Sequence, residues 1–565
     1  MRVEVDDVDS AVASLLNSRS AWSRSVCGLT RSERPIGALV DRDAYAPLTD
    51  RPRVLLVGGM SGDPSDVSLS LAALKWHASL GDLGESIALS AVPCANPGGL
   101  ALGNGPYNGA GGVPGTGYPP EGGYFFDREN PEARHLWRWT SYMASDLVVE
   151  LQSGEATAWQ ANAAASGLAS GLNASALPDD DSFVSALGRH PASGLGVIPA
   201  LRLTVAEQRI EAELGRLWTA IRDSPPGSSQ ARVELDRRRG RSPTEVGWDL
   251  AVTNGRTLEP LVYTQGVAIS GRLRLAALDP GAHENTADIV PLVAPVVEDV
   301  KKILGSEPNA ADVAGVVWAE ELAESTGDPR YNELLVAAGS YFKPGGEGEP
   351  PTATNPDFAV EDTFMVAAVL GRAYKVTGAG AYLNTLTSHL LEGGIQEESG
   401  LFRHSRRGPF HWGRGNGFGA LGHAEALTYL PSDHPKRAAI VEMCHKQMAA
   451  LRHLQEPSGM YVQVIDVPGS YQELTATCMI GYAQARGLRL GWLDESFREP
   501  VERAWAAVSE RVDSRGDITD GCTGSGVMDN LRSYLDRPAN SGYDDRSGSM
   551  ALWFAAEMAR LARNV

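Results

Sequence analysis

The chain has 565 residues, of which 43% are hydrophobic and 21% charged, a composition typical of a soluble globular protein with two or three domains. The formal net charge of −20 argues against nucleic acid or an anionic membrane as a partner. An acidic substrate stays compatible with this charge, because a few Arg and His side chains can reverse the field inside a cleft. No apolar run approaches the length of a membrane span.

The five cysteines are odd in number and scattered, and none forms a CxxC pair. This pattern predicts neither a disulfide framework nor a cysteine zinc site. The first residues, MRVEVDDVDS, are acidic where a signal peptide has a basic stretch followed by an apolar one. We therefore expect a cytoplasmic protein, or a periplasmic or secreted one if a signal peptide has been removed.

The first half of the chain alternates predicted strands with predicted helices. Apolar runs at 53–57, 86–92 and 146–151 have the length and composition of buried strands. Segments 66–79 and 132–144 between them have a helical pattern. Such alternation predicts a parallel sheet with helices on both faces.

Three features of this half resemble the zinc carboxypeptidase family. The first strand ends in a Gly-Gly turn at 58–59, segment 93–99 reads Pro-x-x-Asn-Pro-x-Gly, and segment 146–150 reads Asp-Leu-Val-Val-Glu. The resemblance implies an HxxE motif after the first strand and a second His after a later one. Ser61 and Pro64 stand at the HxxE ligand positions instead.

The segment after the later strand, 150–154, also contains no His. A catalytic zinc needs about three protein ligands, so we expect no metal and no cofactor here. Residues 1–278 are predicted to form a zinc-carboxypeptidase-like α/β domain without peptidase activity. It would serve as a scaffold, as a wall of the neighbouring site or as an oligomer contact, which leaves a homo-oligomer open.

The second half of the chain is predicted to be all helical. After a linker at 279–288, helix-period apolar patterns follow one another from 289 to 565. Two similar stretches, Thr326 to Tyr331 and Thr377 to Tyr382, each follow an Ala-rich helix, and their tyrosines are 51 residues apart (382 − 331). A repeat of this length predicts stacked helical hairpins, which can close into an (α/α) toroid with a pocket lined by loops.

Seven motifs lie in this half, namely EDTFM at 361–365, GLFRH at 400–404, WGRGNGF at 412–418, YVQVID at 461–466, ELTATCM at 473–479, CTG at 522–524 and DRSG at 545–548. In order and spacing they resemble the unsaturated glucuronyl and rhamnogalacturonyl hydrolases of glycoside hydrolase families 88 and 105. The half is short for six hairpins, so we expect the first hairpin to be missing or degenerate. Phe418 and Tyr461 stand where the family commonly has Trp, which alters the sugar-facing aromatic surface.

The resemblance implies removal of a 4,5-unsaturated uronic acid from the non-reducing end of lyase-generated oligosaccharides. A carboxylic acid protonates C4, water adds at C5, and the resulting hemiketal opens and expels the aglycone. This chemistry requires a carboxyl group that is protonated at rest. Asp362 is the candidate and Glu361 its rival, since adjacent helical positions point about 100° apart and only one can face the pocket. The alternative is that both are first-turn acids stabilised by the helix dipole.

The remaining candidates follow from the same motifs. His404 would contact substrate or water near the reacting carbons, or be an ordinary loop His. In the loop at 412–418, Arg414 and Asn416 would bind the uronate or orient water, and Trp412 would stack on the sugar. Weaker candidates for substrate binding are Phe418, Tyr461, Gln463, Glu473, which could equally start a helix, and Asp312, a possible second pocket acid.

Two other functions stay open at this stage. One is a saturated β-glucuronidase on the same toroid that uses two carboxylates. The other is a non-catalytic carbohydrate-binding or assembly protein. The sequence does not specify the polysaccharide, the linkage, the aglycone or the oligomeric state.

Overall fold

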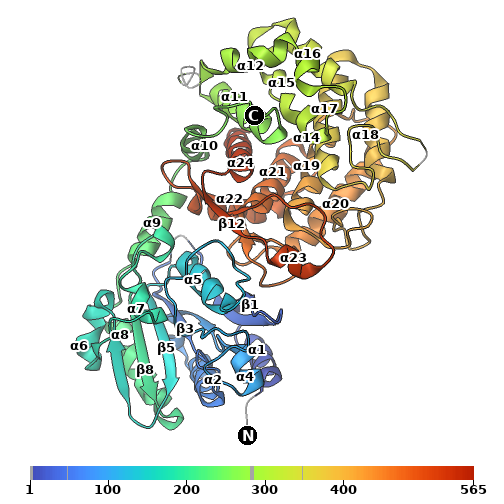
Figure 1. The fold of residues 1–565 in the computed structure, drawn as a ribbon. Coiled ribbons are helices and arrows are strands. Elements are labelled where there is room, and N and C mark those ends of the chain that lie inside the picture. Colours follow the sequence, from blue (N-terminus) through green and yellow to red (C-terminus); the bar gives the residue numbers. More distant parts are fainter. Residues whose placement is uncertain (1–3, 47–48, 280, 282–285, 347, 565) are drawn as a thin grey trace. The chain divides into compact units, whose positions relative to one another are not determined.

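The computed structural model describes residues 4–46, 49–279, 281, 286–346 and 348–564 (Figure 1). The chain divides into two compact units. The first comprises Met1–Arg238 and the short segment Pro468–Tyr471, and the second comprises Arg239–Val467 and Gln472–Val565. Each unit is described separately below.

The boundary between the units falls at Arg239, which is 40 residues before the expected linker (279 − 239). Two helices that the sequence analysis assigned to the first domain, α10 (Pro243–Ala251) and α11 (Tyr263–Leu278), therefore belong to the second unit. Of the expected linker, residues 280 and 282–285 lie outside the described residues.

The first unit is built on an eight-stranded sheet with the order β1-β2-β4-β3-β5-β8-β6-β7. The strands are β1 (Trp22–Leu29), β2 (Pro35–Asp41), β3 (Arg53–Val57), β4 (Ala88–Val92), β5 (Leu147–Ser153), β6 (Ala158–Ala161), β7 (Ser175–Ala176) and β8 (Ala200–Val205). The central four, β4-β3-β5-β8, are parallel, and β2 and β6 flank them in antiparallel orientation. The three predicted strands are β3, β4 and β5, at the centre of the sheet.

Both faces of this sheet are covered by helices, as Figure 1 shows. Val54 and Leu56 of β3 belong to a core with α1 (Val5–Ser18), α2 (Pro64–Ser79) and α8 (Ile210–Asp223). Leu55 and Val57 belong to the opposite core, with α5 (Pro131–Met143), α7 (Phe183–Leu187) and α9 (Gln230–Arg239). This alternation of side chains explains why β3 is apolar throughout. The predicted α/β class is confirmed.

Hydroxyl and carboxylate groups occupy the place where the HxxE motif was expected. Ser61 donates a hydrogen bond to Asp66, and Asp66 accepts one from the backbone and one from the hydroxyl of Ser153, both 2.7 Å long. The hydroxyls of Ser65 and Ser153 are 2.6 Å apart. Among the described residues, no group of three His, Cys, Asp or Glu side chains could hold a metal ion.

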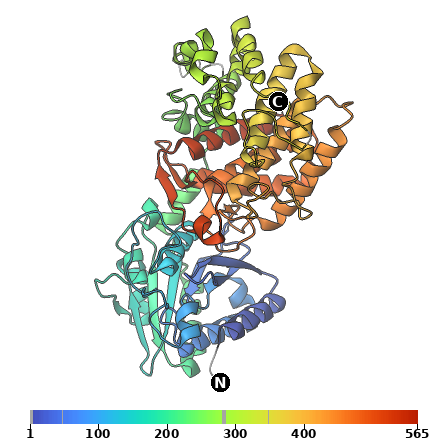
Figure 2. The same cartoon turned by 45° about the vertical axis from the view of Figure 1, so that its right-hand side comes forward.

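The second unit is an α/α toroid around one hydrophobic core. Its inner helices are α11, α17 (Glu361–Thr377), α19 (Gly413–Tyr429), α21 (Leu474–Leu490) and α24 (Asp545–Arg563), and the sixth place is filled by the broken helix α14 (Ala310–Val313), η5 (Ala314–Val316) and α15 (Ala319–Thr326). Outer helices include α10, α12 (Ile289–Glu298), α16 (Pro329–Gly339), α18 (Gly380–Glu392), α20 (Arg437–Leu454) and α22 (Arg498–Glu510) (Figure 2).

The inner ring closes through α11, which packs against α24 on one side and against η5 and α15 on the other. The expectation of a missing or degenerate first hairpin is wrong, because α10 and α11 supply it from sequence assigned to the other domain. Val267, Ile269 and Leu275 of α11 are fully buried in the toroid core.

The inner helices run in the same direction, so the ring has two different ends. At one end first turns meet, where the hydroxyls of Thr475 on α21 and Ser547 on α24 are 2.9 Å apart. At the other end last turns meet, where Arg486 on α21 pairs with Glu425 on α19. We call these ends the amino mouth and the carboxyl mouth of the toroid.

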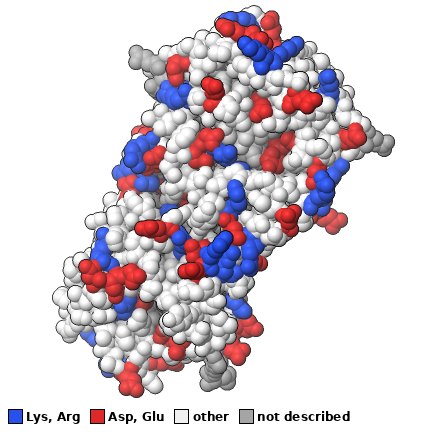
Figure 3. Space-filling model, in the orientation of Figure 1, with Lys and Arg blue, Asp and Glu red and all other residues white. Residues whose placement is uncertain are grey.

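None of the helices in the described ranges is long and apolar enough to cross a membrane. On the face drawn in Figure 3, acidic and basic side chains are interspersed. The negative net charge is therefore not gathered into one patch on that face.

Candidate active site

Asp362 lies in the first turn of α17 at the amino mouth and is 8% exposed. Its Oδ2 accepts a hydrogen bond of 2.7 Å from the backbone N–H of Asn355, and no ion pair to it occurs in the described part of the chain. Burial raises the pKa of Asp362 to about 7, the Asn355 bond opposes the rise, and the charge of Glu361 adds to it. A carboxyl group that is protonated near neutral pH and reaches the surface can act as a general acid.

Glu361 has a different environment from its neighbour. Its Oε1 lies 3.2 Å from Nε2 of His404, and the side chain is 26% exposed. The other ring nitrogen of His404 lies 2.6 Å from the hydroxyl of Tyr534. Glu361, His404 and Tyr534 thus form a hydrogen-bonded chain. Glu361 is therefore bonded to a histidine side chain, whereas Asp362 is bonded only to a backbone N–H group.

Residues 413–418 of the glycine-rich segment are helical, so the prediction of a loop there is wrong. Trp412 is the residue before α19, and its carbonyl accepts a hydrogen bond of 2.9 Å from the N–H of Asn416. A Cβ atom at Gly413 would lie only 2.4 Å from the carbonyl oxygen of Val462. The glycines therefore serve close packing of this helix rather than a turn.

Arg414 is the buried cation of the amino mouth, with 4% exposure. Its guanidinium lies 4.5 Å from the ring centroid of Trp412 and donates a hydrogen bond of 3.2 Å to the carbonyl of Cys522. Its Nε makes no hydrogen bond to any described residue. Arg414 also lies within reach of the charge of Glu361. A guanidinium with unused donors is suited to bind a carboxylate.

Trp412 is fully buried and has no exposed face on which a sugar could stack. Its ring is 4.6 Å from that of His404, and it also contacts Arg414. Trp412 therefore acts as a platform that fixes His404 and Arg414 relative to each other.

Four further predicted residues lie beneath the surface of the amino mouth and are at most 1% exposed: Asn416, Phe418, Tyr461 and Gln463. The amide of Asn416 accepts a hydrogen bond of 2.8 Å from the N–H of Phe402 and donates to the carbonyls of Phe402 and Trp412. The Phe418 ring packs 5.7 Å from that of Tyr263. Gln463 donates to the carbonyl of Tyr534, and Tyr461 accepts from Gln484. These side chains support the residues at the mouth.

The carboxyl groups of the two remaining predicted acids accept hydrogen bonds at the starts of helices. Glu473 caps α21, and its carboxyl group accepts hydrogen bonds from the N–H groups of Thr475 and Ala476, as the helix-start alternative predicted. Burial raises the pKa of Glu473 to about 7, although these hydrogen bonds oppose the rise. Asp312 accepts a hydrogen bond of 2.7 Å from Asn309, the capping residue of α14.

Three further residues of the amino mouth were not predicted from the sequence, namely Tyr263, Tyr534 and Arg546. Tyr263 opens α11 and is close enough to Arg414, Arg546 and Glu361 to interact electrostatically with them. Tyr534 lies on the short helix α23 (Leu531–Leu535). The DRSG motif at 545–548 pointed to Arg546, but no role was assigned to it. Tyr263 was hidden by its assignment to the first domain, and Tyr534 belongs to none of the motifs.

Comparisons with known proteins give the family of the second unit. The family model described as Glycosyl Hydrolase Family 88 matches residues 236–562, which is more than half of the chain. The unsaturated rhamnogalacturonyl hydrolase YesR of Bacillus subtilis (strain 168) is 31% identical over 128 residues, which cover 23% of this chain and 36% of YesR, so the match spans about a third of that relative.

Two solved structures represent the two halves. A family 105 glycoside hydrolase from C. acetobutylicum ATCC 824 has a TM-score of 0.49 and 17% identity, covering 56% of this chain and 99% of its own. A metallo-carboxypeptidase from Burkholderia cenocepacia has a TM-score of 0.33 and 12% identity, covering 39% of this chain and 69% of its own. On the extent of the family match, the chain belongs to glycosyl hydrolase family 88.

Proposed function

We propose that this protein is a glycoside hydrolase that removes a 4,5-unsaturated uronic acid from the non-reducing end of an oligosaccharide. The observation that carries the proposal is the environment of Asp362, a buried carboxyl group that has no cationic partner in the described ranges and whose pKa is raised to about 7. Family membership and the reaction named for YesR support it. A polysaccharide lyase would supply such a substrate, because lyases leave a C4=C5 double bond at the new non-reducing end.

Asp362 performs the first step by donating its proton to C4 of the unsaturated ring. The π electrons of the vinyl ether form the new C4–H bond, and the cation at C5 is shared with the ring oxygen. Water adds at C5, and its proton returns to the Asp362 carboxylate. The hemiketal formed at C5 opens to a ketone, and the hemiacetal at C1 then releases the aglycone as an alcohol. One acid therefore suffices, without a nucleophile at C1.

Four other side chains prepare this step. Arg414 receives the uronate carboxylate with its unused donors. Both ring nitrogens of His404 are engaged, one with Glu361 and the other with Tyr534, so His404 positions the Glu361 carboxylate. Oε2 of Glu361 has no hydrogen-bond partner among the described residues and can accept a hydrogen bond from the attacking water. The negative charge of Glu361 also keeps Asp362 protonated.

The test follows the absorbance of the C4=C5 bond with lyase-generated oligosaccharides. Asp362→Asn keeps the shape of the side chain and the bond from Asn355 but removes the proton donor, so the rate is expected to fall by roughly 10²–10⁴-fold. Glu361→Gln is the matched control at the adjacent position and is expected to retain more activity than Asp362→Asn.

A larger loss in Glu361→Gln than in Asp362→Asn would exchange the roles of the two acids. Wild-type protein that leaves the absorbance unchanged but releases glucuronate from intact glycosides would replace the proposal with a saturated β-glucuronidase.

A further inference from the structure

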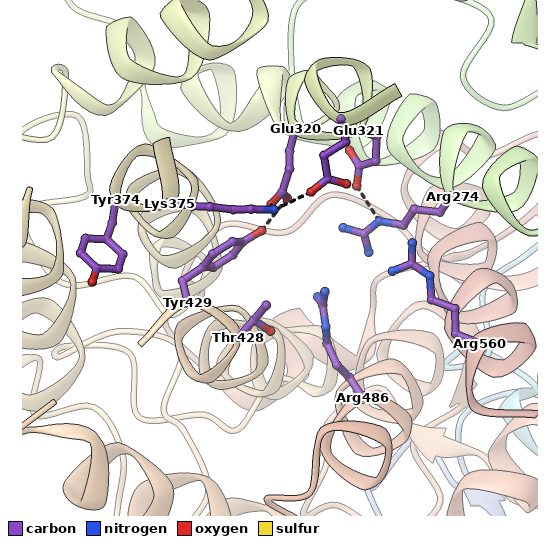
Figure 4. Close-up of a pocket in the computed structure, with 10 residues that line it drawn as sticks. Arg274, Glu320, Glu321, Tyr374, Lys375, Thr428, Tyr429, Arg486 and Arg560 are labelled. Atoms are coloured by element: carbon purple, nitrogen blue, oxygen red, sulfur yellow. Dashed lines mark hydrogen bonds and ion pairs between the residues drawn. The ribbon is translucent and has the colours of Figure 1, made fainter. Parts of the chain in front are cut away.

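A second polar cavity lies at the carboxyl mouth of the toroid, at the opposite ends of the inner helices from Asp362. Its volume is about 400 Å³, enough for a monosaccharide or a smaller anion. Arg274 of α11, Arg486 of α21 and Arg560 of α24 line one side of it. Figure 4 shows the three guanidinium groups directed toward the same space.

The carboxylates on the opposite wall are already paired. Glu320 accepts from Lys375 at 2.8 Å, and its other oxygen lies 3.0 Å from Arg372. Glu321 accepts from Nε of Arg274 at 2.7 Å, and the hydroxyl of Tyr482 accepts from its Nη1 at 2.9 Å. Nη2 of Arg274 is left to face the cavity (Figure 4). These acids therefore do not neutralise the arginines on the first wall completely.

Beneath this wall, the remaining carboxylates form buried ion pairs. Glu425 binds Arg372 and Arg486, and Glu557 binds Arg489 at 2.6 Å. Among the described residues that line the cavity or pair with its lining and beneath it, there are six cations and five carboxylates: Arg274, Arg372, Lys375, Arg486, Arg489 and Arg560, and Glu320, Glu321, Glu324, Glu425 and Glu557.

Arg560 is the cation in excess. Its guanidinium makes no hydrogen bond and no ion pair with any described residue, although Arg274 and Arg486 lie beside it. Burial and the charge of Arg274 lower the pKa of Arg560, and Glu557 offsets only part of this effect. Arginines crowded together in a partly buried cavity repel one another and lose hydration, so an anion between them would stabilise the mouth.

We propose that the carboxyl mouth binds a small oxyanion between Arg274, Arg486 and Arg560. Phosphate, sulfate and carboxylate groups each have a pair of acceptor oxygens that can accept two parallel hydrogen bonds from one guanidinium group. The size of the cavity admits either a free inorganic anion or an acidic monosaccharide. This site is separate from the amino mouth and does not depend on the reaction proposed there.

The test is calorimetric titration of the full chain with inorganic phosphate at constant ionic strength. Arg560→Met keeps the apolar stem and is expected to weaken phosphate binding at least 10-fold. Arg563→Met removes the same charge from an exposed position on the same helix and is expected to bind phosphate as the wild type does. Arg414→Met, which alters the amino mouth, is also expected to bind phosphate normally.

Titration of Arg414→Met with D-glucuronate and with D-glucose distinguishes the sources of the anion. Binding of glucuronate but not glucose would identify an acidic sugar, and binding of phosphate alone would identify an inorganic anion. Because Arg560 has no ion pair to lose, Arg560→Met should unfold at the wild-type midpoint or above it. The proposal is overturned if neither anion binds saturably to the wild type, or if Arg560→Met binds phosphate with wild-type affinity.

Discussion

The pKa of a buried carboxyl group is shifted in opposite directions at the two mouths of the helical ring. At the amino mouth, Asp362 has no cation beside it among the described residues, and burial raises its pKa to about 7. At the carboxyl mouth, Glu425 is fully buried, yet the guanidinium groups of Arg372 and Arg486 overcome the effect of burial and lower its pKa. Both acids lie on inner helices of the same core.

The difference shows that burial alone does not decide what an acid does. An acid that is buried next to arginines stays charged and contributes to structure, whereas one that is buried without them keeps its proton and becomes available for chemistry. The predictions below test this contrast in order of decreasing effect.

Removal of a cation at the carboxyl mouth should have the largest effect on stability. Arg372→Met removes one of the two guanidinium groups that bind Glu425 and the guanidinium that lies 3.0 Å from Glu320. Breaking a buried pair in this way is expected to lower the free energy of unfolding by about 3–5 kcal/mol. Urea unfolding measures it, with Arg563→Met as the exposed control. A loss below about 1 kcal/mol would show that these pairs are not needed to hold the buried acids.

Removal of the cation at the amino mouth should weaken substrate binding and not the stability of the fold. Arg414→Met is expected to lower kcat/KM for unsaturated oligosaccharides by roughly 10–100-fold, mainly through KM, because one charge-assisted carboxylate contact is lost. Methyl esterification of the uronate breaks the same ion pair by removing the negative charge of the substrate. If Arg414 binds this carboxylate, the variant acting on the ester should be little worse than either change alone. Fully additive losses would place the carboxylate elsewhere.

The raised pKa of Asp362 predicts a pH dependence of activity and of stability. Only the protonated form is active, so kcat/KM should fall as the pH rises through about 7. The Asp362 carboxyl group ionises at a lower pH in the unfolded chain than in the folded one. As the pH rises from the ordinary aspartate pKa to about 7, Asp362 therefore destabilises the fold progressively.

Asp362→Asn should therefore be more stable than the wild type by roughly 1–2 kcal/mol at pH 8, with the difference vanishing near pH 4. Urea unfolding at both pH values measures this. A variant that is less stable than the wild type at pH 8 would contradict the assignment of a desolvated acid.

Local patterns in the sequence were sufficient for part of this account. The apolar runs of β3, β4 and β5 predicted the centre of the sheet, and the helical pattern from residue 361 predicted that Glu361 and Asp362 lie in a first helical turn, that of α17. Both inferences depend on residues close together in the chain.

Features set by distant contacts were not predictable in the same way. The glycines at 412–418 suggested a loop, but they allow close packing of α19 against a neighbouring carbonyl. Trp412 and Asn416 were expected at the surface, and their partners come from segments that only the fold brings near. Tyr263 belongs to a helix whose place in the ring depends on its packing against α24.

The most direct test of the central claim is proton NMR of the reaction in D₂O. Hydration predicts that the vinyl H4 signal disappears at the rate at which the aglycone is released, and that the product carries deuterium at C4. Release of a sugar that still shows its vinyl proton would mean cleavage at C1 with the double bond intact, and would contradict the role of Asp362 as the acid that protonates C4.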